Sequence, residues 1–195
     1  MSAASLSDAL AARFPQAVVA AHAFRGDATA TLRRENLLEI ARFLKEDDRF
    51  QMNFLMDLTA VDYLTFGKQE QARGAHVPSG VPVPQPMTIS DAEPWPGPAV
   101  PSARFEVVYH FYSHALKHRF RLKVPVEEGA AEVDSLTSLW ASADWFEREV
   151  WDMYGIRFRG HPNLKRILMY SQFEGHPLRK DYPVNRRQPL IGPVN

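Results

Sequence analysis

The chain has 195 residues, of which 45% are hydrophobic and 24% are charged, and its formal net charge is zero. This size and composition predict one ordinary globular domain with tails. The sequence contains no cysteine, which excludes disulfides, thiolate-ligated iron–sulfur clusters and a cysteine nucleophile within the chain. No run approaches the ~18 apolar residues of a membrane-spanning helix. Met1 to Leu10 lacks a secretory pattern, so we expect a cytosolic or matrix-like location.

Charge is unevenly placed along the chain. The segment from Arg157 to the C-terminus carries a net charge of +6, and the rest carries −6. This division predicts that the basic end meets an acidic partner, and a solvated basic tail is the alternative.

The first fifty residues alternate between helix and strand patterns. The expected elements are a helix at Leu6–Phe14, a strand at Ala17–Phe24, a strand returning at Ala28–Leu32 after a turn at Gly26-Asp27, and an amphipathic helix at Glu35–Lys45. Ser7 or Asp8 stands near the start of the first helix, and Pro15 closes it.

Three runs rich in β-branched and aromatic residues predict adjacent antiparallel strands at Gln51–Phe66, Arg104–Tyr112 and Arg119–Val126. Ser113–His118 is the expected hairpin loop. A proline-rich insertion, about residues 67–101, separates the first two strands. Its prolines forbid helix and ladder pairing, which predicts a spacer, or alternatively a polyproline ligand for another protein.

The region Glu132–Tyr154 is predicted to be helical, with Asp144 as a cap and Gly155 as the stop. Beyond it, prolines recur and apolar periodicity fades. The sequence therefore predicts an α+β domain at residues 1–170, with a mostly antiparallel sheet flanked by helices. It also predicts an extended C-terminal tail at residues 171–195, which is either disordered or bound along the surface of a partner.

Nucleotide and metal sites are not indicated. No two glycines have the G-x-G spacing, and the phosphate-loop spacing of Gly155 and Gly160 is followed by His161-Pro162 in place of Lys-Ser/Thr. The histidines His110, His114 and His118 straddle a strand, a turn and a strand, which directs them apart, so surface histidines are the better interpretation.

Two other kinds of chemistry remain open. Glu147, Glu149 and Asp152 with His161 and His176 could serve a hydrolase, but Glu147 and Glu149 lie on different helix sides. Arg148 and Asp152 have the spacing of an ion pair, which favours a structural network. Phe158, Tyr170, Phe173 and Tyr182 interleave with basic residues as in a nucleic-acid-binding module, although the chain as a whole is not basic.

Trp145–Met169 contains a dense motif of Glu-Arg-Glu, an acid, two apolar residues, a histidine, a basic residue and an aliphatic pair. The positions are Glu147, Arg148, Glu149, Asp152, Met153, Tyr154, His161, Lys165, Ile167 and Leu168. It resembles the motif of the thirty-kilodalton subunit family of the NADH:quinone oxidoreductase, respiratory complex I. Glu174-Gly-His-Pro-Leu-Arg-Lys-Asp-Tyr-Pro183, Asp57-Leu-Thr-Ala-Val-Asp-Tyr63 and Arg104-Phe-Glu-Val-Val-Tyr-His110 also resemble that family, and the insertion is the main departure.

The resemblance implies a cofactor-free structural subunit beside the large subunit that forms the quinone site and beside neighbouring iron–sulfur subunits, with FMN and Fe-S clusters in the partners. It implies peripheral attachment to the cytoplasmic side of the inner membrane through the complex alone, and no nucleic acid. The equivalent subunit of a related membrane-bound hydrogenase is the nearest alternative, although the closing block favours the quinone-reducing branch.

We expect an internal network in which Arg148 pairs with Asp152 and His161-Pro162 rigidifies the turn, so that the tail leaves in a fixed direction. The remaining structural or interface residues expected from the two motifs are Gly155, Arg166, His176, Pro177, Arg179, Lys180, Asp181 and Tyr182.

Overall fold

The computed structural model describes residues 2–66 and 103–189, so the predictions for the insertion and for the last six residues lie outside the described part. Its helices are α1 (Ala3–Arg13), α2 (Leu37–Glu46) and α3 (Ala143–Tyr154), and its strands are β1 (Val18–Phe24), β2 (Asp27–Leu32), β3 (Phe54–Asp62), β4 (Phe105–Tyr112), β5 (Arg119–Val126), β6 (Glu132–Asp134) and β7 (Arg157–Arg159). This arrangement confirms the α+β class.

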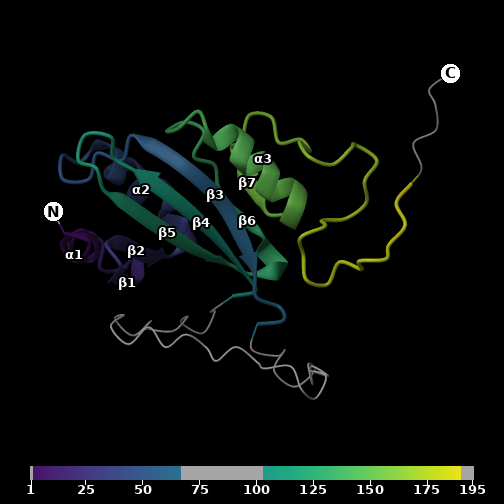
Figure 1. The fold of residues 1–195 in the computed structure, drawn as a ribbon, viewed down its shortest axis with the longest axis horizontal. Coiled ribbons are helices and arrows are strands. Elements are labelled where there is room, and N and C mark those ends of the chain that lie inside the picture. The colour runs from purple at the N-terminus through teal and green to yellow at the C-terminus, as the bar shows by residue number, and fades with distance from the viewer. Residues whose placement is uncertain (1, 67–102, 190–195) are drawn as a thin grey trace, which may run out of the picture.

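The main sheet has five strands in the order β1-β2-β5-β4-β3 (Figure 1). All neighbours pair antiparallel except β2 and β5, which run parallel. The predicted adjacency of β3, β4 and β5 is confirmed, and β1 and β2 form the expected hairpin.

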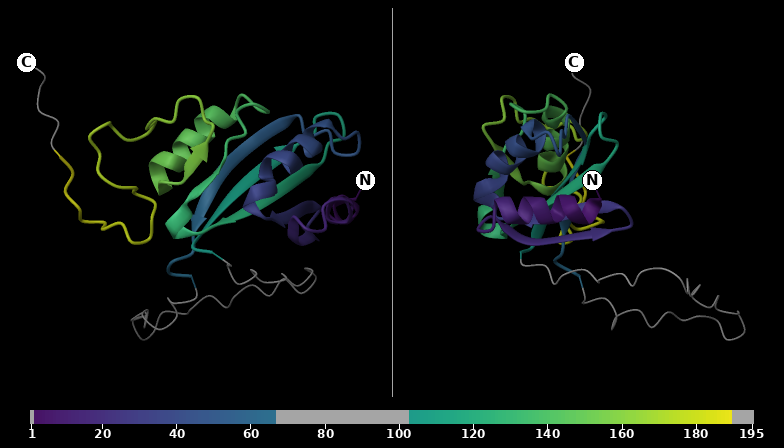
Figure 2. Two further views of the ribbon diagram at one scale, coloured as in Figure 1. Left: turned by 180° about the vertical axis from the view of Figure 1, so that it is seen from behind. Right: turned by 90° about the vertical axis from the view of Figure 1, so that its left-hand side faces the viewer.

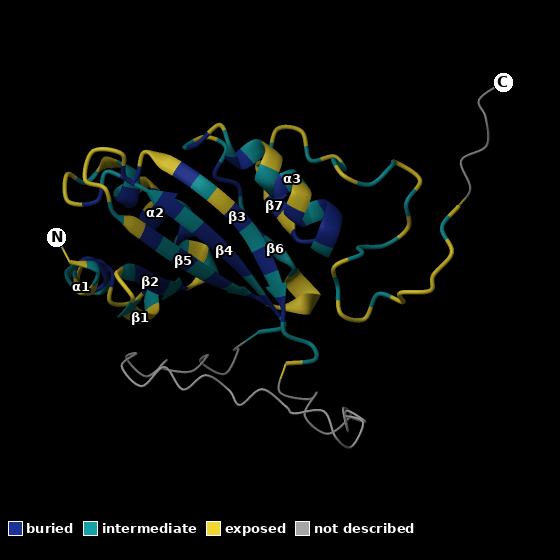
Figure 3. Cartoon of the chain, in the orientation of Figure 1, coloured by how far each residue is buried: buried dark blue, intermediate teal, exposed yellow. Residues whose placement is uncertain are grey.

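One face of the sheet carries the core. Side chains alternate along β5 and along most of β4, so that Phe105, Tyr109, Phe111 and Leu122 are buried on that face. There the ring of Phe111 packs on Trp140, just before α3, with centroids 4.9 Å apart, and α1 lies against β1 and β2. Figure 2 (left) shows α2 crossing this face, whereas the face toward the viewer in Figure 1 carries no helix. Figure 3 shows the alternation as banded strands.

Several predicted boundaries were wrong for local reasons. α1 begins at Ala3 because the hydroxyl of Ser2 accepts the backbone N–H of Ser5 (3.2 Å), which makes Ser2 the cap. β3 begins only at Phe54, since Gln51 has a positive φ of 45° and turns the chain. A short 3₁₀ turn (Arg34–Asn36) precedes α2.

The predicted helix at Glu132–Tyr154 was wrong in its first half. Glu132–Asp134 forms β6, which pairs parallel with β7, and α3 begins at Ala143. Asp144 lies in the first helical turn and does not cap it. Gly155 ends α3 as predicted, with a left-handed φ of 75°.

Candidate functional site

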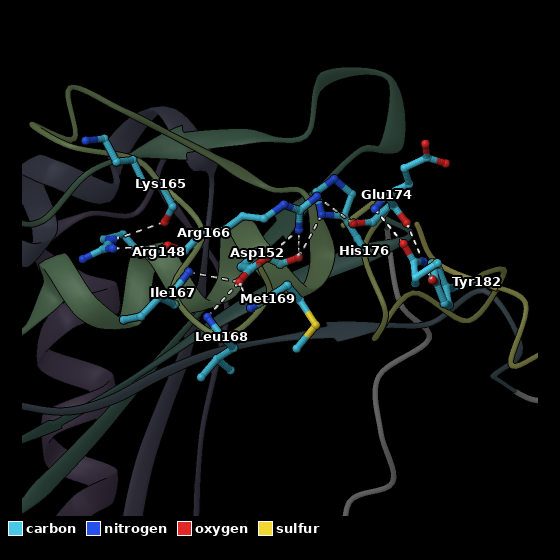
Figure 4. Close-up of polar contacts among 12 residues, drawn as sticks. Arg148, Asp152, Lys165, Arg166, Ile167, Leu168, Met169, Glu174, His176 and Tyr182 are labelled. Carbon is cyan, nitrogen blue, oxygen red and sulfur yellow. Dashed lines mark hydrogen bonds and ion pairs between the residues drawn. The ribbon is translucent and has the colours of Figure 1, made fainter. Parts of the chain in front are cut away.

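The residues of the two motifs meet where α3 ends. Asp152 lies in the last turn of α3, and its side chain is fully buried. One carboxylate oxygen accepts three successive backbone N–H groups, from Ile167 (3.1 Å), Leu168 (2.9 Å) and Met169 (2.9 Å). The other oxygen accepts the guanidinium of Arg166 (Figure 4). The loop that follows β7 is thereby folded around one carboxylate.

Electrostatics keep Asp152 ionised. Burial by itself would raise the pKa of this carboxyl, but the N–H donors of residues 167–169 and the guanidinium of Arg166 together hold the pKa below its ordinary value. The negative charge therefore stabilises the loop at neutral pH.

The C-terminal segment caps α3. The last carbonyl groups of a helix lack partners within the helix. Here the carbonyl of Asp152 lies 3.0 Å from Nδ1 of His176, that of Met153 accepts the N–H of Leu178 (3.1 Å), and that of Tyr154 accepts Nε of Arg179 (2.5 Å).

Gly155 makes this close approach possible. A Cβ atom at this position would lie 2.6 Å from the imidazole of His176 and 2.9 Å from the guanidinium of Arg179. The left-handed backbone of Gly155 is also one that other residues rarely adopt. Glycine at the helix end thus allows the left-handed turn and also leaves room for His176 and Arg179 against the end of α3.

A second buried carboxylate, Asp62, holds the next part of the segment. Its side chain is fully buried at the end of β3 and accepts Nε (3.2 Å) and Nη2 (3.0 Å) of Arg104, together with the backbone N–H groups of Lys180 (2.8 Å) and Leu64 (3.0 Å). Arg104 also pairs with Asp181 (2.7 Å). Burial would raise the pKa of Asp62, but Arg104 and these N–H donors lower it.

The segment is also closed upon itself. The guanidinium of Arg166 donates to the carbonyl of Gly175 (3.0 Å), and the ring of Tyr182 lies against Gly175. Arg186 pairs with Glu174 (2.6 Å). The buried carboxylates Asp152 and Asp62, together with these contacts, are called the tail anchor below. The segment that the tail anchor holds comprises residues 165–188, since Gln188 also donates to the carbonyl of Glu174.

The predicted ion pair between Arg148 and Asp152 was wrong. Arg148 donates instead to the backbone carbonyls of Lys165 (3.2 Å) and Arg166 (3.3 Å), while Asp152 points inward and binds Arg166. Both residues still bind the same loop, Arg148 through the carbonyl groups of the loop and Asp152 through its N–H groups. Lys165 itself is exposed.

His161 and Pro162 lie in the turn after β7. Nε2 of His161 is 3.1 Å from the carbonyl oxygen of Asp144, and its Nδ1 accepts the N–H of Asn163 (3.0 Å). Both ring nitrogens are therefore occupied by local contacts, which supports a role in shaping the turn.

The two glutamates that could have served as catalytic residues of a hydrolase, Glu147 and Glu149, lie apart. Glu149 is exposed, whereas Glu147 is fully buried and accepts the N–H of Leu136 (2.6 Å). Burial raises the pKa of Glu147 to about 7. The second oxygen of Glu147 and the buried hydroxyl of Tyr109 have no hydrogen-bond partner within the described residues. This geometry places Glu147 and Glu149 on different sides of α3 and gives them no shared substrate position.

Within residues 2–66 and 103–189, no group of three or more His, Cys, Asp or Glu side chains could hold a metal ion. Nor is any helix in these residues long and apolar enough to cross a membrane.

Sequence reasoning missed Asp62 and Arg104 as members of the site, although both lie in the stretches that resemble the family. Their separation along the chain hides the ion pair, which only the pairing of β3 with β4 brings together.

Comparisons with known proteins agree with the motif. Residues 30–188 match the family model described as the respiratory-chain NADH dehydrogenase, 30 Kd subunit. An NADH-quinone oxidoreductase subunit of Citrifermentans bemidjiense is 41% identical over 182 residues, covering 92% of this chain and 90% of the relative. The corresponding subunit of Coxiella burnetii is 40% identical over 194 residues, covering 97% and 79%.

A solved structure shares the fold at lower identity. The structure of the membrane-bound sulfane sulfur reductase, an archaeal respiratory membrane complex, contains a chain that matches with a TM-score of 0.60 and 18% identity, over 93% of this chain and 85% of that one.

Proposed function

The chain belongs to the 30 kDa subunit family of the respiratory-chain NADH:quinone oxidoreductase, and on that premise we propose that it is a structural and assembly subunit of the peripheral arm, without catalytic residues of its own. The complex as a whole transfers electrons from NADH through FMN and iron–sulfur clusters to a quinone, coupled to proton pumping. Other subunits of that complex are its partners. The neighbours proposed are the large quinone-site subunit and the iron–sulfur subunits, on the cytoplasmic side of the inner membrane.

The observation that carries this proposal is the tail anchor. It uses backbone groups and buried carboxylates on the inner side of the segment, and it leaves apolar side chains outside: Leu168 is 56% exposed, Leu178 48% and Val184 fully exposed. Exposed apolar residues on a chain held in place are what a partner surface buries. Contacts within the chain already offset much of the conformational entropy that the segment loses when it is ordered. A partner that binds the segment therefore gains more binding free energy than it would from a disordered tail.

Charge supports an acidic partner. The side chains of Lys165, Lys180 and Arg187 are exposed on the same segment and have no ion pair among the described residues. Complementary charge raises the rate and the specificity of association. The segment therefore offers apolar contacts beside free cations.

The nucleic-acid alternative loses support from the same geometry. Tyr170, Phe173 and Tyr182 pack on one another, with ring centroids 5.7 and 6.1 Å apart, so their faces are not presented as a stacking platform. Arg166 and Arg186 are engaged by Asp152 and Glu174.

Membership of a related complex, such as a membrane-bound hydrogenase, is the second candidate, and the likeness to the sulfane sulfur reductase chain is one of fold. A purification from the native membrane in mild detergent, with this chain as bait, separates the two. Iron–sulfur and quinone-site subunits together with NADH:quinone activity support the proposal. The same partners with hydrogenase activity favour the alternative, and a lone chain without redox partners overturns both.

A further inference from the structure

The two edges of the main sheet differ in how they are covered. β3 forms one edge, where the hydroxyl of Ser142, just before α3, donates to the carbonyl of Leu55 (3.3 Å) and the backbone N–H of Lys180 donates to the carboxylate of Asp62 (2.8 Å). β1 forms the other edge and, among residues 2–66 and 103–189, pairs only with β2. Residues 19–22 of β1 are exposed, with Val19 at 63%. Figure 2 (right) shows this hairpin beside α1 at the margin of the molecule.

The register of the hairpin gives the direction of the free backbone groups. Arg25 and Gly26 form a two-residue turn with φ values of 49° and 84°, and Phe24 pairs with Asp27 across it. The pair that closes such a turn is hydrogen-bonded, and bonded and non-bonded pairs alternate along an antiparallel ladder. The N–H and C=O groups of Ala21 and Ala23 therefore point away from β2, toward the open edge.

This edge lacks the usual protection. Val18–Phe24 contains no charged residue and no proline, whereas exposed edge strands are commonly guarded by lysine, proline or an inward charge. Its one irregularity is a register shift between Val18 and Ala20. An uncharged, extended row of donors and acceptors is a template for another strand.

In β-strand addition, the main-chain hydrogen bonds between the two strands supply the affinity.

We propose that β1 accepts an extended segment of a neighbouring subunit of the complex as a sixth strand of the sheet. The segment is small and uncharged where it faces Ala21 and Ala23, and it is free of proline where it pairs. This inference rests on the proposed function, because the neighbour belongs to the assembled complex.

Hydrogen–deuterium exchange of peptides covering Val18–Phe24 tests it, with the full-length chain measured alone and in the purified complex. We expect exchange in the complex to be slower by about tenfold or more, as for amides that gain a hydrogen bond. Equal exchange in a complex that contains the chain overturns the inference and leaves the proposed function standing. Absence of the chain from the complex overturns both.

A pair of variants at one position supplies a second test. Ala21→Pro removes an outward N–H without breaking the pairing with β2, whereas Ala21→Val keeps it. Both chains are expected to melt near the parent temperature, but the proline chain should enter the complex at about a tenth of the parent level or less, since lost hydrogen bonds weaken the added strand. Equal incorporation of the two folded chains contradicts the proposal. Concentration-dependent dimers of the free chain with protected β1 amides would show that a second copy is the occupant, which also overturns it. If the proline chain does not fold, the exchange measurement on the parent chain decides.

Discussion

Replacing Asp152 with asparagine removes one negative charge from the centre of the tail anchor and changes little in shape. In the parent, the carboxylate accepts the N–H groups of Ile167, Leu168 and Met169 and the guanidinium of Arg166. An asparagine side chain can accept at one atom only, and its NH₂ group would face either the three N–H donors or the guanidinium. The variant therefore leaves at least one set of donors without an acceptor.

The expected loss is large for a single-atom change. Breaking one side of a buried charge pair costs about 3–5 kcal/mol, and the lower figure corresponds to roughly a 150-fold change in an opening equilibrium, at about 1.36 kcal/mol per factor of ten. The side chain of Asp152 is fully buried and that of Arg166 is only 16% exposed, so solvent screening reduces this value little. This loss of stability affects the loop that Asp152 holds and not the main sheet, because the carboxylate of Asp152 is hydrogen-bonded to residues 166–169.

Hydrogen exchange of the full-length chain measures this opening. The amides of residues 167–169 in Asp152→Asn should exchange about a hundredfold faster or more, while those of β4 and β5 change little. Asp57→Asn is the control, because Asp57 is an exposed carboxylate of β3 without an ion pair in the described residues. Parental exchange at residues 167–169 in Asp152→Asn would refute the role assigned to this carboxylate.

Acidification should open the same site in the parent chain. The pKa of Asp152 in the folded state lies below its unfolded value of 3.8, so its stabilisation is complete above pH 3.8 and is lost as pH falls through the folded pKa. The pKa of Asp62 is shifted in the same direction. Below pH 3.8, where pepsin is active, we expect this protease to cleave the chain within residues 165–182. Protection of these residues from pepsin in that pH range would contradict this prediction.

Three further predictions concern the helix and the second carboxylate. Burial raises the pKa of Glu147 from 4.5 to about 7. The parent chain is therefore most stable below pH 4.5, where Glu147 is neutral in the folded and the unfolded state, and it loses stability as the pH rises to 7. Glu147→Gln should have a free energy of unfolding in urea about 3 kcal/mol above that of the parent at pH 8, with little difference at pH 4.5. Gly155→Ala should cost about 1–2 kcal/mol from the left-handed backbone alone and should also displace His176, which faster trypsin cleavage after Arg179 would report; unchanged cleavage would contradict the cap. Arg104→Met leaves Asp62 buried without its cation and should destabilise the chain by about 3–5 kcal/mol, so a urea midpoint equal to the parent would refute the pairing.

The strands of the main sheet could be predicted because their signal is local. Arg104–Tyr112 is rich in β-branched and aromatic residues, and Arg119–Val126 alternates between inward apolar and outward residues; β4 and β5 follow these bounds within one residue. β6 could not be predicted in this way, since three residues carry no period. Its partner, β7, lies beyond α3, so the pairing is visible only in the folded chain.

The error at Arg148 shows where spacing stops being informative. An i, i+4 pair shares a helix face, but spacing does not say whether that face meets solvent or the core. Asp152 is buried, and its acceptors are filled by a loop that follows fourteen or more residues later. A surface ion pair contributes less than a buried carboxylate that gathers four donors, so Arg148 is left to bind the carbonyls of the same loop.

Structural contacts account for the charged residues of the dense motif on α3. Its acids and bases serve three distinct tasks: Glu147 lies in the core, Asp152 gathers the loop, and Arg148 binds the outer side of that loop. The closing block then returns His176 and Arg179 to the end of the same helix. The segment after β7 forms no strand and buries few apolar side chains, so packing alone does not fix its position. The buried carboxylates of Asp152 and Asp62 supply the hydrogen bonds that do. Arg148 and Asp152, which resemble part of a reactive cluster in the sequence, therefore fix the position of the loop at residues 165–169.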